Sequence, residues 1–130
     1  MKIANRIEAR LSGSTAMAYS RCISDSARSI AVLEVASRTY MDHLEGRSAD
    51  SEFLDLATAR RVAVGCQALM TRLGDNPSIG QHLAVQAAVD YFILEDDGED
   101  DDSIVGFDDD LEVVRVTAEV LGWDLPEINA

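Results

Sequence analysis

An almost uninterrupted apolar segment, residues 83–94, runs directly into the most acidic part of the chain. Only Gln86 and Asp90 are polar within that segment, whereas residues 95–110 contain ten carboxylates. Unpaired carboxylates are too costly to bury together, so these acids must lie in a solvated loop or be neutralised by a cation or a basic partner. The chain therefore has to join a buried element to a highly charged one. Asp90, inside the apolar segment, requires a partner of its own.

Apolar residues elsewhere recur with the 3.6-residue period of amphipathic helices, and glycine or proline separates the segments. The 130 residues suit one domain, with 47% hydrophobic but only 5% aromatic residues. A core of Ala, Val, Leu and Ile favours packed helices over a β-sandwich. The sequence therefore predicts an all-α fold for residues 1–130, a compact bundle of about five helices with an acidic loop between the last two.

The first half of the chain is expected to contain three helical segments. Residues 1–13 form a short helix or N-terminal arm, and residues 14–45 form a second segment that residues 24–26 can divide. A third helix is expected from 51 to 73, with a serine as its cap. A fourth follows Pro77, which fits the first helical position because proline has no N–H to leave unsatisfied.

The last helix is expected to begin after the acidic loop. Asp108 is its predicted cap, and Asp109 and Asp110 complement the positive end of the helix dipole. Several valines in this segment leave a strand as the alternative. Residues 122–130 then form a C-terminal tail, in which Trp123 is expected to fold back on the core.

Charge is distributed unevenly along the chain. Residues 95–130 carry one basic and fourteen acidic side chains, a balance equal to the net charge of −13 for the whole chain. Such a segment repels phosphate groups, so direct nucleic-acid binding is not expected. No apolar run reaches the ~20 residues of a membrane span, and no hydrophobic signal core follows the N-terminus. Cys22 and Cys66 are isolated in the sequence and are interpreted as buried, reduced thiols. Together these features predict a cytoplasmic protein without a membrane span.

Familiar catalytic motifs are absent from the sequence, which contains no GxSxG, HExxH, phosphate-cradling glycine loop or dinucleotide fingerprint. The two histidines, His43 and His82, belong to no recognisable motif. The chain also lacks a nucleophile paired with a base. These observations favour a non-enzymatic protein.

The carboxylate cluster is the candidate site. Its oxygens are hard ligands that suit Ca²⁺, Mg²⁺ or Mn²⁺, but an EF-hand is not expected because Val105 stands where an oxygen ligand is needed. Asp109 and Asp110 have a structural explanation as first-turn charges, whereas Asp97 and Asp101 have none. A solvated loop, an acidic patch that faces a protein and a specific metal site are all compatible with this cluster.

Part of the chain resembles a known family. The order Tyr91-Phe92-Ile93-Leu94, Asp97-x3-Asp101 and Gly106-Phe107-x-Asp109-Asp110 is similar to the YkvA-like family of unknown function, over residues about 82–121. In that family an apolar helix runs into a short loop with two aspartates, and a Gly-aromatic-x-Asp-Asp element opens the next helix. The resemblance implies a small helical domain with Asp97, Asp101, Asp109 and Asp110 as its marked positions. A more distant similarity is to tellurite-resistance TerB-like helical domains.

These features predict a non-enzymatic interaction or regulatory module that attracts a basic protein partner through residues 95–110. The alternative is a divalent-cation-binding protein or a metal-dependent hydrolase that uses the same carboxylates. The expected partner-binding residues are Glu95, Asp96, Glu99, Asp100 and Asp102. The expected metal ligands are Asp97, Asp101, Asp109 and Asp110.

Overall fold

The computed structural model describes residues 2–47, 55–94 and 107–129, which form seven helices and no strand. The helices are α1 Ile3–Glu8, α2 Gly13–Ser20, α3 Ile30–Arg47, α4 Leu56–Leu73, α5 Ile79–Leu94, α6 Asp108–Leu121 and α7 Pro126–Asn129. The all-α prediction is confirmed, but the number of about five helices is wrong. Residues 21–29 divide the second predicted segment into α2 and α3, and the predicted tail contains α7.

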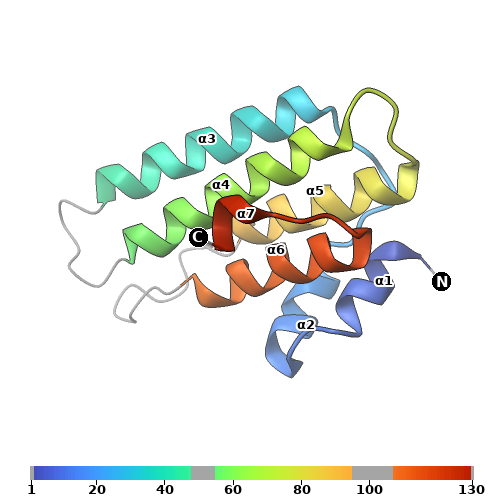
Figure 1. Cartoon of the computed structure of the whole chain (residues 1–130). Coiled ribbons are helices and arrows are strands. Elements are labelled where there is room, and N and C mark those ends of the chain that lie inside the picture. Colours follow the sequence, from blue (N-terminus) through green and yellow to red (C-terminus); the bar gives the residue numbers. More distant parts are fainter. Residues whose placement is uncertain (1, 48–54, 95–106, 130) are drawn as a thin grey trace.

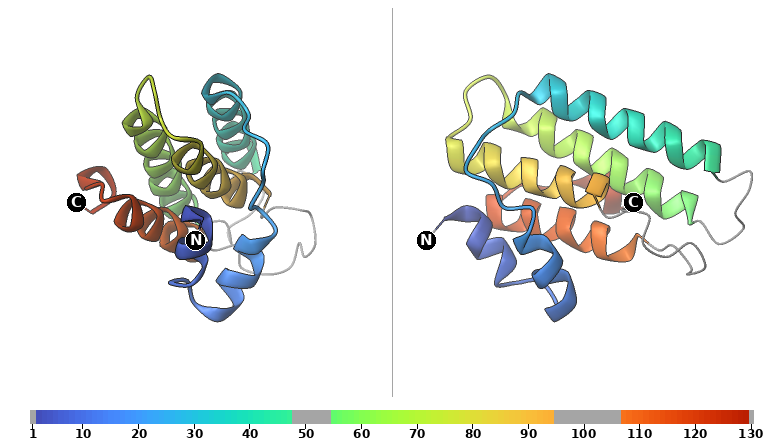
Figure 2. Two further views of the ribbon diagram at one scale, coloured as in Figure 1. Left: turned by 90° about the vertical axis from the view of Figure 1, so that its right-hand side faces the viewer. Right: turned by 180° about the vertical axis from the view of Figure 1, so that it is seen from behind.

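The four long helices, α3 to α6, form the body of the fold, and successive ones run antiparallel (Figure 1). α4 and α5 are the central pair, since each of them contacts both α3 and α6. α1 and α2 pack on α5 and α6, on the side away from α3 (Figure 2). This topology places the C-terminus of α5 and the N-terminus of α6 at the same end of the bundle.

The apolar helix predicted to lie centrally does so. Every residue from 84 to 92 in α5 is buried, as expected of a helix that is apolar nearly all round. Among the largest fully buried side chains of the described residues are eight from six helices and one loop: Ile7, Tyr19, Leu33, Leu44, Leu69, Phe92, Phe107 and Ile128. None of the described helices has the combination of length and hydropathy that crossing a bilayer requires.

The starts of α4 and α5 are fixed by side-chain caps. Asp55 is the N-cap of α4, and its Oδ1 accepts the Thr58 N–H (3.1 Å). The predicted start of this helix at residue 51 is therefore wrong, because α4 begins at Leu56. At α5 the Gln81 N–H donates to Ser78 Oγ (3.1 Å) and the Ser78 N–H donates to Gln81 Oε1 (3.2 Å). This reciprocal capping box puts Pro77 before the cap, so its predicted place at the first helical position is wrong.

α6 is a helix throughout, which excludes the strand alternative for residues 108–121. Phe107 occupies its cap position without a side-chain cap bond, so the prediction that Asp108 is the cap is wrong by one residue. The helix ends at Gly122, whose φ of +77° is left-handed. The Trp123 N–H then reaches back to the Ala118 carbonyl oxygen (2.8 Å), which completes a Schellman ending.

Close packing between α4 and α6 depends on Gly65. A Cβ at this position would lie 2.7 Å from Val114 Cγ1 and 3.2 Å from Ile128 Cγ2. Contacts as short as 2.7 Å do not occur without displacement of the neighbour. Gly65 therefore allows α6, whose first turn is acidic, to pack closely on α4.

α7 is held on α4 by two arginines. The Arg61 guanidinium donates to the Ile128 carbonyl oxygen, and Arg72 makes two 3.1 Å contacts with the Glu127 carboxylate. Leu125 is buried below this short helix. Trp123 packs partly buried against the core, as the sequence predicted.

Candidate interaction surface

Aromatic contacts anchor the end of α5 and the start of α6 in the core. Phe92 lies near the end of α5, and Phe107 immediately precedes α6. The rings of Phe92 and Phe107 meet at 6.1 Å and 66°, while Tyr40 meets Phe92 edge-on at 4.9 Å and 87°. Such edge-to-face geometry is favourable for aromatic rings. Phe92 and Phe107, which lie on either side of residues 95–106, therefore share one place in the core.

The three aspartates of the first turn of α6 lie in different surroundings. Asp108 and Asp109 are exposed, whereas Asp110 is only 1% exposed. Successive residues of a helix are rotated by about 100°, so the packing of α6 on α4 carries Asp110 inward. Burial, followed by the charge of Asp110, raises the pKa of the Cys66 thiol on α4. Asp110 is thus a core residue beside Cys66, while its two neighbours face solvent.

The predicted metal ligands are only partly visible. Asp97 and Asp101 lie outside the described residues, and Asp109 and Asp110 face different surroundings. Within residues 2–47, 55–94 and 107–129, no group of three or more His, Cys, Asp or Glu side chains is placed to hold a metal ion. The four-carboxylate site stays a prediction.

The predicted partner-binding residues, Glu95, Asp96, Glu99, Asp100 and Asp102, all lie outside the described residues. The structure adds two candidates at the border of that segment. Neither Asp108 nor Asp109 forms a side-chain hydrogen bond or ion pair with any described residue. Their negative charge lies at the positive end of the α6 dipole, where it stabilises the helix without a partner.

Carboxylates farther along α6 do have partners, which come from the N-terminal helices. Glu112 accepts the backbone N–H of Ser12 (2.9 Å) and its hydroxyl (3.1 Å), and Glu119 forms an ion pair with Arg10. The α1–α2 arm therefore covers the middle and the end of one face of α6. It leaves the first turn exposed.

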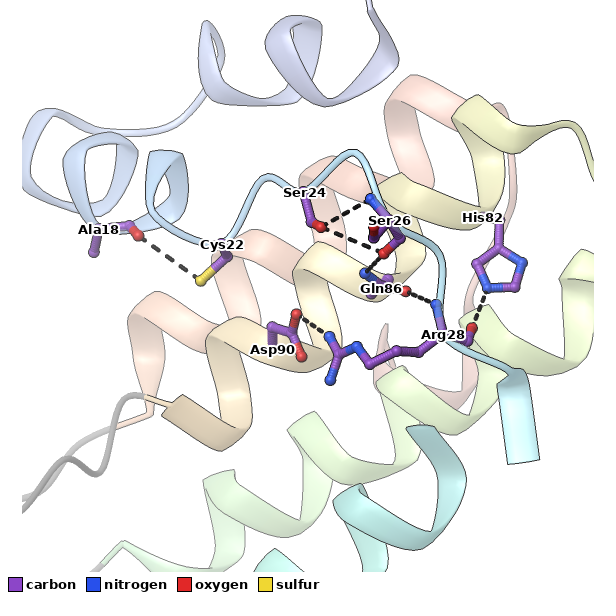
Figure 3. A network of polar contacts seen from close by, with 8 residues as sticks. All are labelled: Ala18, Cys22, Ser24, Ser26, Arg28, His82, Gln86 and Asp90. Atoms are coloured by element: carbon purple, nitrogen blue, oxygen red, sulfur yellow. Dashed lines mark hydrogen bonds and ion pairs between the residues drawn. The ribbon is translucent and has the colours of Figure 1, made fainter. Parts of the chain in front are cut away.

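A polar network that the sequence only hinted at joins α5 to residues 21–29 (Figure 3). Asp90, whose side chain is 11% exposed, forms an ion pair with Arg28. Gln86 accepts the Arg28 N–H (2.7 Å) and donates to the Ser26 carbonyl oxygen (2.9 Å), while His82 Nε2 donates to the Arg28 carbonyl oxygen (2.6 Å). The partner that Asp90 required is thus Arg28.

The role of this network is structural. His82, Gln86 and Asp90 are spaced by four residues, so they form one stripe along α5. That stripe supplies backbone partners to a connecting segment that has no helix of its own between α2 and α3. The spacing of polar residues on an otherwise apolar helix was the signal for it. His43, the other histidine, stacks on Tyr40 with ring centroids 6.5 Å apart.

Comparisons of the chain with protein-family models, with curated proteins and with solved structures found no match. The YkvA-like resemblance of residues about 82–121 therefore stays a prediction, and the functional argument depends on the residues themselves.

Proposed function

We propose that this protein is a small non-enzymatic interaction module that binds a basic partner protein through its acidic region, defined as residues 95–110. The observation that carries the proposal is the exposed first turn of α6. Asp108 and Asp109 present two carboxylates with no described partner, directly beside the segment that contains the other carboxylates of the region.

The charge of the whole chain supports the proposal. Twenty-four acidic side chains face eleven Lys and Arg, so one-for-one pairing leaves thirteen carboxylates without a basic partner. Folding gains nothing from such an excess, because like charges repel one another in the compact state. Association with a basic protein does gain, since a localised charge steers the encounter and raises the association rate.

The pairing pattern along α6 indicates where the partner binds. Glu119 is engaged by Arg10 and Glu112 by Ser12, so the arm already occupies these carboxylates. No described residue pairs with Asp108 or Asp109, so these two exposed carboxylates can meet an external cationic group. Their position after Phe107, which is anchored in the core, holds these two charges on a rigid support.

The experiment measures binding of a fluorescent peptide of alternating arginine and glycine by anisotropy, at low salt and at physiological ionic strength. The Asp108→Asn/Asp109→Asn double variant is expected to bind about fivefold more weakly, the loss of two exposed charge pairs. The matched control is Asp42→Asn/Asp75→Asn, which removes the same charge from exposed sites elsewhere. The control is expected to bind within twofold of the parent protein, by the same reasoning on screened distant charges.

Equal weakening in both double variants would show a response to net charge alone and would contradict a localised binding region. Peptide binding that does not respond to salt would contradict the electrostatic basis. Neutralising Glu99, Asp100, Asp101 and Asp102 tests the part of the region outside the described residues, and it is expected to weaken binding further.

The alternative, divalent-cation binding by Asp97, Asp101, Asp109 and Asp110, is tested in the same proteins by calorimetry with Ca²⁺, Mg²⁺ and Mn²⁺. Heat that disappears in Asp101→Asn/Asp109→Asn would favour the cation site over the partner site. The absence of heat at millimolar cation would remove the alternative.

A further inference from the structure

Three carboxylates recur along one face of α6. Asp108, Glu112 and Glu119 are spaced by four and then seven residues, which places them on the same side of the helix. The α1–α2 arm packs on α6, on the side of the bundle away from α3 (Figure 2). The exposed first turn of α6 therefore continues into a stripe of carboxylates that the arm contacts farther along.

Glu112 takes part in folding the arm. Its carboxylate accepts the Ser12 N–H (2.9 Å) and the Ser12 hydroxyl (3.1 Å). Ser12 occupies the N-cap position of α2 and makes no side-chain cap bond to that helix. The negative charge of Glu112 thus lies at the positive end of α2, where it is favourable. Glu112 is therefore committed to the fold.

Glu119 is held much more loosely. Its only side-chain partner among the described residues is the Arg10 guanidinium, and the two side chains are 56% and 50% exposed. Ion pairs with this degree of exposure contribute little to stability. The arm is anchored instead by Ile7 in α1 and Tyr19 in α2, which are both fully buried. Arg10 can therefore leave Glu119 while both helices of the arm stay in place.

We propose that Arg10 is an internal competitor of the basic partner, which makes its contact with Glu119 autoinhibitory. A guanidinium group of the partner replaces Arg10 on Glu119, so the binding surface extends from the acidic region along α6. This inference rests on the proposed function, in which the partner binds Asp108 and Asp109. Because one guanidinium group replaces another, Glu119 is paired before and after binding, and the partner's affinity is reduced by the displacement of Arg10.

A single partner segment can reach both ends of the stripe. Asp108 and Glu119 are eleven residues apart, which is roughly 16 Å at 1.5 Å per residue of helix. An extended segment of about five residues covers that length. Arg115 is exposed on the same face, between Glu112 and Glu119. The stripe therefore has two acidic ends, and the partner needs basic groups at two separated positions.

The test uses the fluorescent peptide of alternating arginine and glycine, followed by anisotropy at physiological ionic strength. Arg10→Gln is expected to bind it about threefold more tightly than the parent, because Glu119 is then available without competition. The matched control is Arg6→Gln, since Arg6 is exposed on the same arm and bonds to no described residue. It makes the same change in net charge and is expected to stay within about 1.5-fold of the parent.

A double-mutant cycle assigns the gain to Glu119. In the Glu119→Gln background, adding Arg10→Gln is expected to change the affinity no more than Arg6→Gln does, because Arg10 has no carboxylate left to occupy. A second measurement follows the parent by NMR as the peptide is added. The Arg10 Nε–H signal is expected to shift at saturation, whereas the Arg6 signal stays in place. Thermal unfolding confirms that the variants, all at exposed positions, fold.

The inference is overturned if Arg10→Gln and Arg6→Gln bind the peptide equally, or if Arg10→Gln binds it more weakly than the parent. A gain that persists in the Glu119→Gln background, or an Arg10 signal that does not move at saturation, also overturns it. Each of these results leaves the proposed function standing, provided that Asp108→Asn/Asp109→Asn weakens peptide binding. Absence of peptide binding in the parent would contradict the proposed function, and this inference with it.

Discussion

The polar residues of α5 and those at the start of α6 are used in opposite ways. Gln86 and Asp90 lie on a buried helix, and each is bonded to residues 21–29. Asp108 and Asp109 lie on a solvated turn and bond to no described residue. The first pair is needed to complete the fold, because a buried polar group without a partner is costly. The second pair contributes to the fold only through the helix dipole, which is worth about 0.3–1 kcal/mol for each exposed charge.

This difference separates polar groups that serve stability from those left for binding. Asp90 shares its helix with eight other buried residues, and its charge is compensated within the molecule by Arg28. The carboxylates of α6 show the same division on a smaller scale, since Glu112 and Glu119 are engaged by the arm while the first turn is not. Mutations of the polar residues of α5 should therefore change the free energy of unfolding, whereas mutations at the start of α6 should change partner binding.

The largest expected effect comes from Arg28→Ala, which leaves the largely buried carboxylate of Asp90 without its cation. We expect a loss of about 2 kcal/mol in the free energy of unfolding, less than for a fully buried pair because the Arg28 side chain is 44% exposed. Urea denaturation followed by circular dichroism measures it. The backbone bonds of Arg28 to Gln86 and His82 remain, so the loss reports the ion pair.

Arg38→Ala is the matched control, because Arg38 is exposed on α3 and pairs with no described residue. It is expected to stay within about 0.5 kcal/mol of the parent. The Arg28→Ala/Asp90→Asn double variant should recover part of the loss, because the unpaired charge is gone. If Arg28→Ala were no more harmful than Arg38→Ala, the structural role assigned to the α5 stripe would be wrong.

Gln86→Leu tests the neutral member of the same stripe. Gln86 is 1% exposed and makes two hydrogen bonds to the backbone of residues 26 and 28. Its replacement is expected to cost about 1.5 kcal/mol, since two backbone groups lose their partner. Gln67→Leu is the comparison, because Gln67 bonds to Glu34 on an exposed surface. A similar cost at both positions would show that burial does not decide the effect.

Tyr19→Phe is expected to increase the free energy of unfolding, whereas the preceding variants decrease it. The Tyr19 side chain is fully buried, and its hydroxyl has no hydrogen-bond partner among the described residues. Burial, followed by the nearby Cys22 and Glu8, raises the pKa of this phenol. Removing the hydroxyl should therefore stabilise the fold by up to about 1 kcal/mol, as measured by urea denaturation. A destabilised variant would show that the hydroxyl contributes to packing after all.

The sequence predicted the helices better than the segments that connect them. Periodic apolar residues and the glycines at 74 and 122 indicated most of the long helices, and the apolar run indicated that α5 is central. The connecting segment at residues 21–29 was harder to predict, because Ile23 and Ala27 fit the helical period. There the backbone takes its hydrogen bonds from the Gln86 side chain, which lies about sixty residues away in the chain. Local pattern carries no information on such a bond.

The candidate site divides in the same way. The sequence showed that Asp90 needs a partner and that the first turn of α6 is acidic. It could not identify Arg28, because many arginines were available, and it could not distinguish Asp110 from Asp109. That distinction depends on how α6 is rotated against α4, which tertiary packing at Gly65 and Val114 decides. Residues 95–106 stay a matter of prediction.

The smallest expected effect concerns Glu127, whose carboxylate is exposed and yet bonded to Arg72. It is therefore intermediate between the buried, bonded Asp90 and the exposed Asp108 and Asp109. The pKa of Glu127 lies below its ordinary value of 4.5, because its own backbone N–H and the Arg72 guanidinium both stabilise the charged form. A lowered pKa means that this contact is fully present above pH 4.5 and is lost as the pH falls through the lowered pKa.

α7 should therefore loosen only in acid, and an NMR titration of the Glu127 carboxyl group, with Trp123 fluorescence as a local reporter, measures this. Arg72→Gln is expected to move the pKa of Glu127 upward, toward 4.5. An unchanged titration in that variant would show that Arg72 does not hold α7. α7 would then owe its position to the Arg61 bond with the Ile128 carbonyl oxygen and to the burial of Leu125 and Ile128.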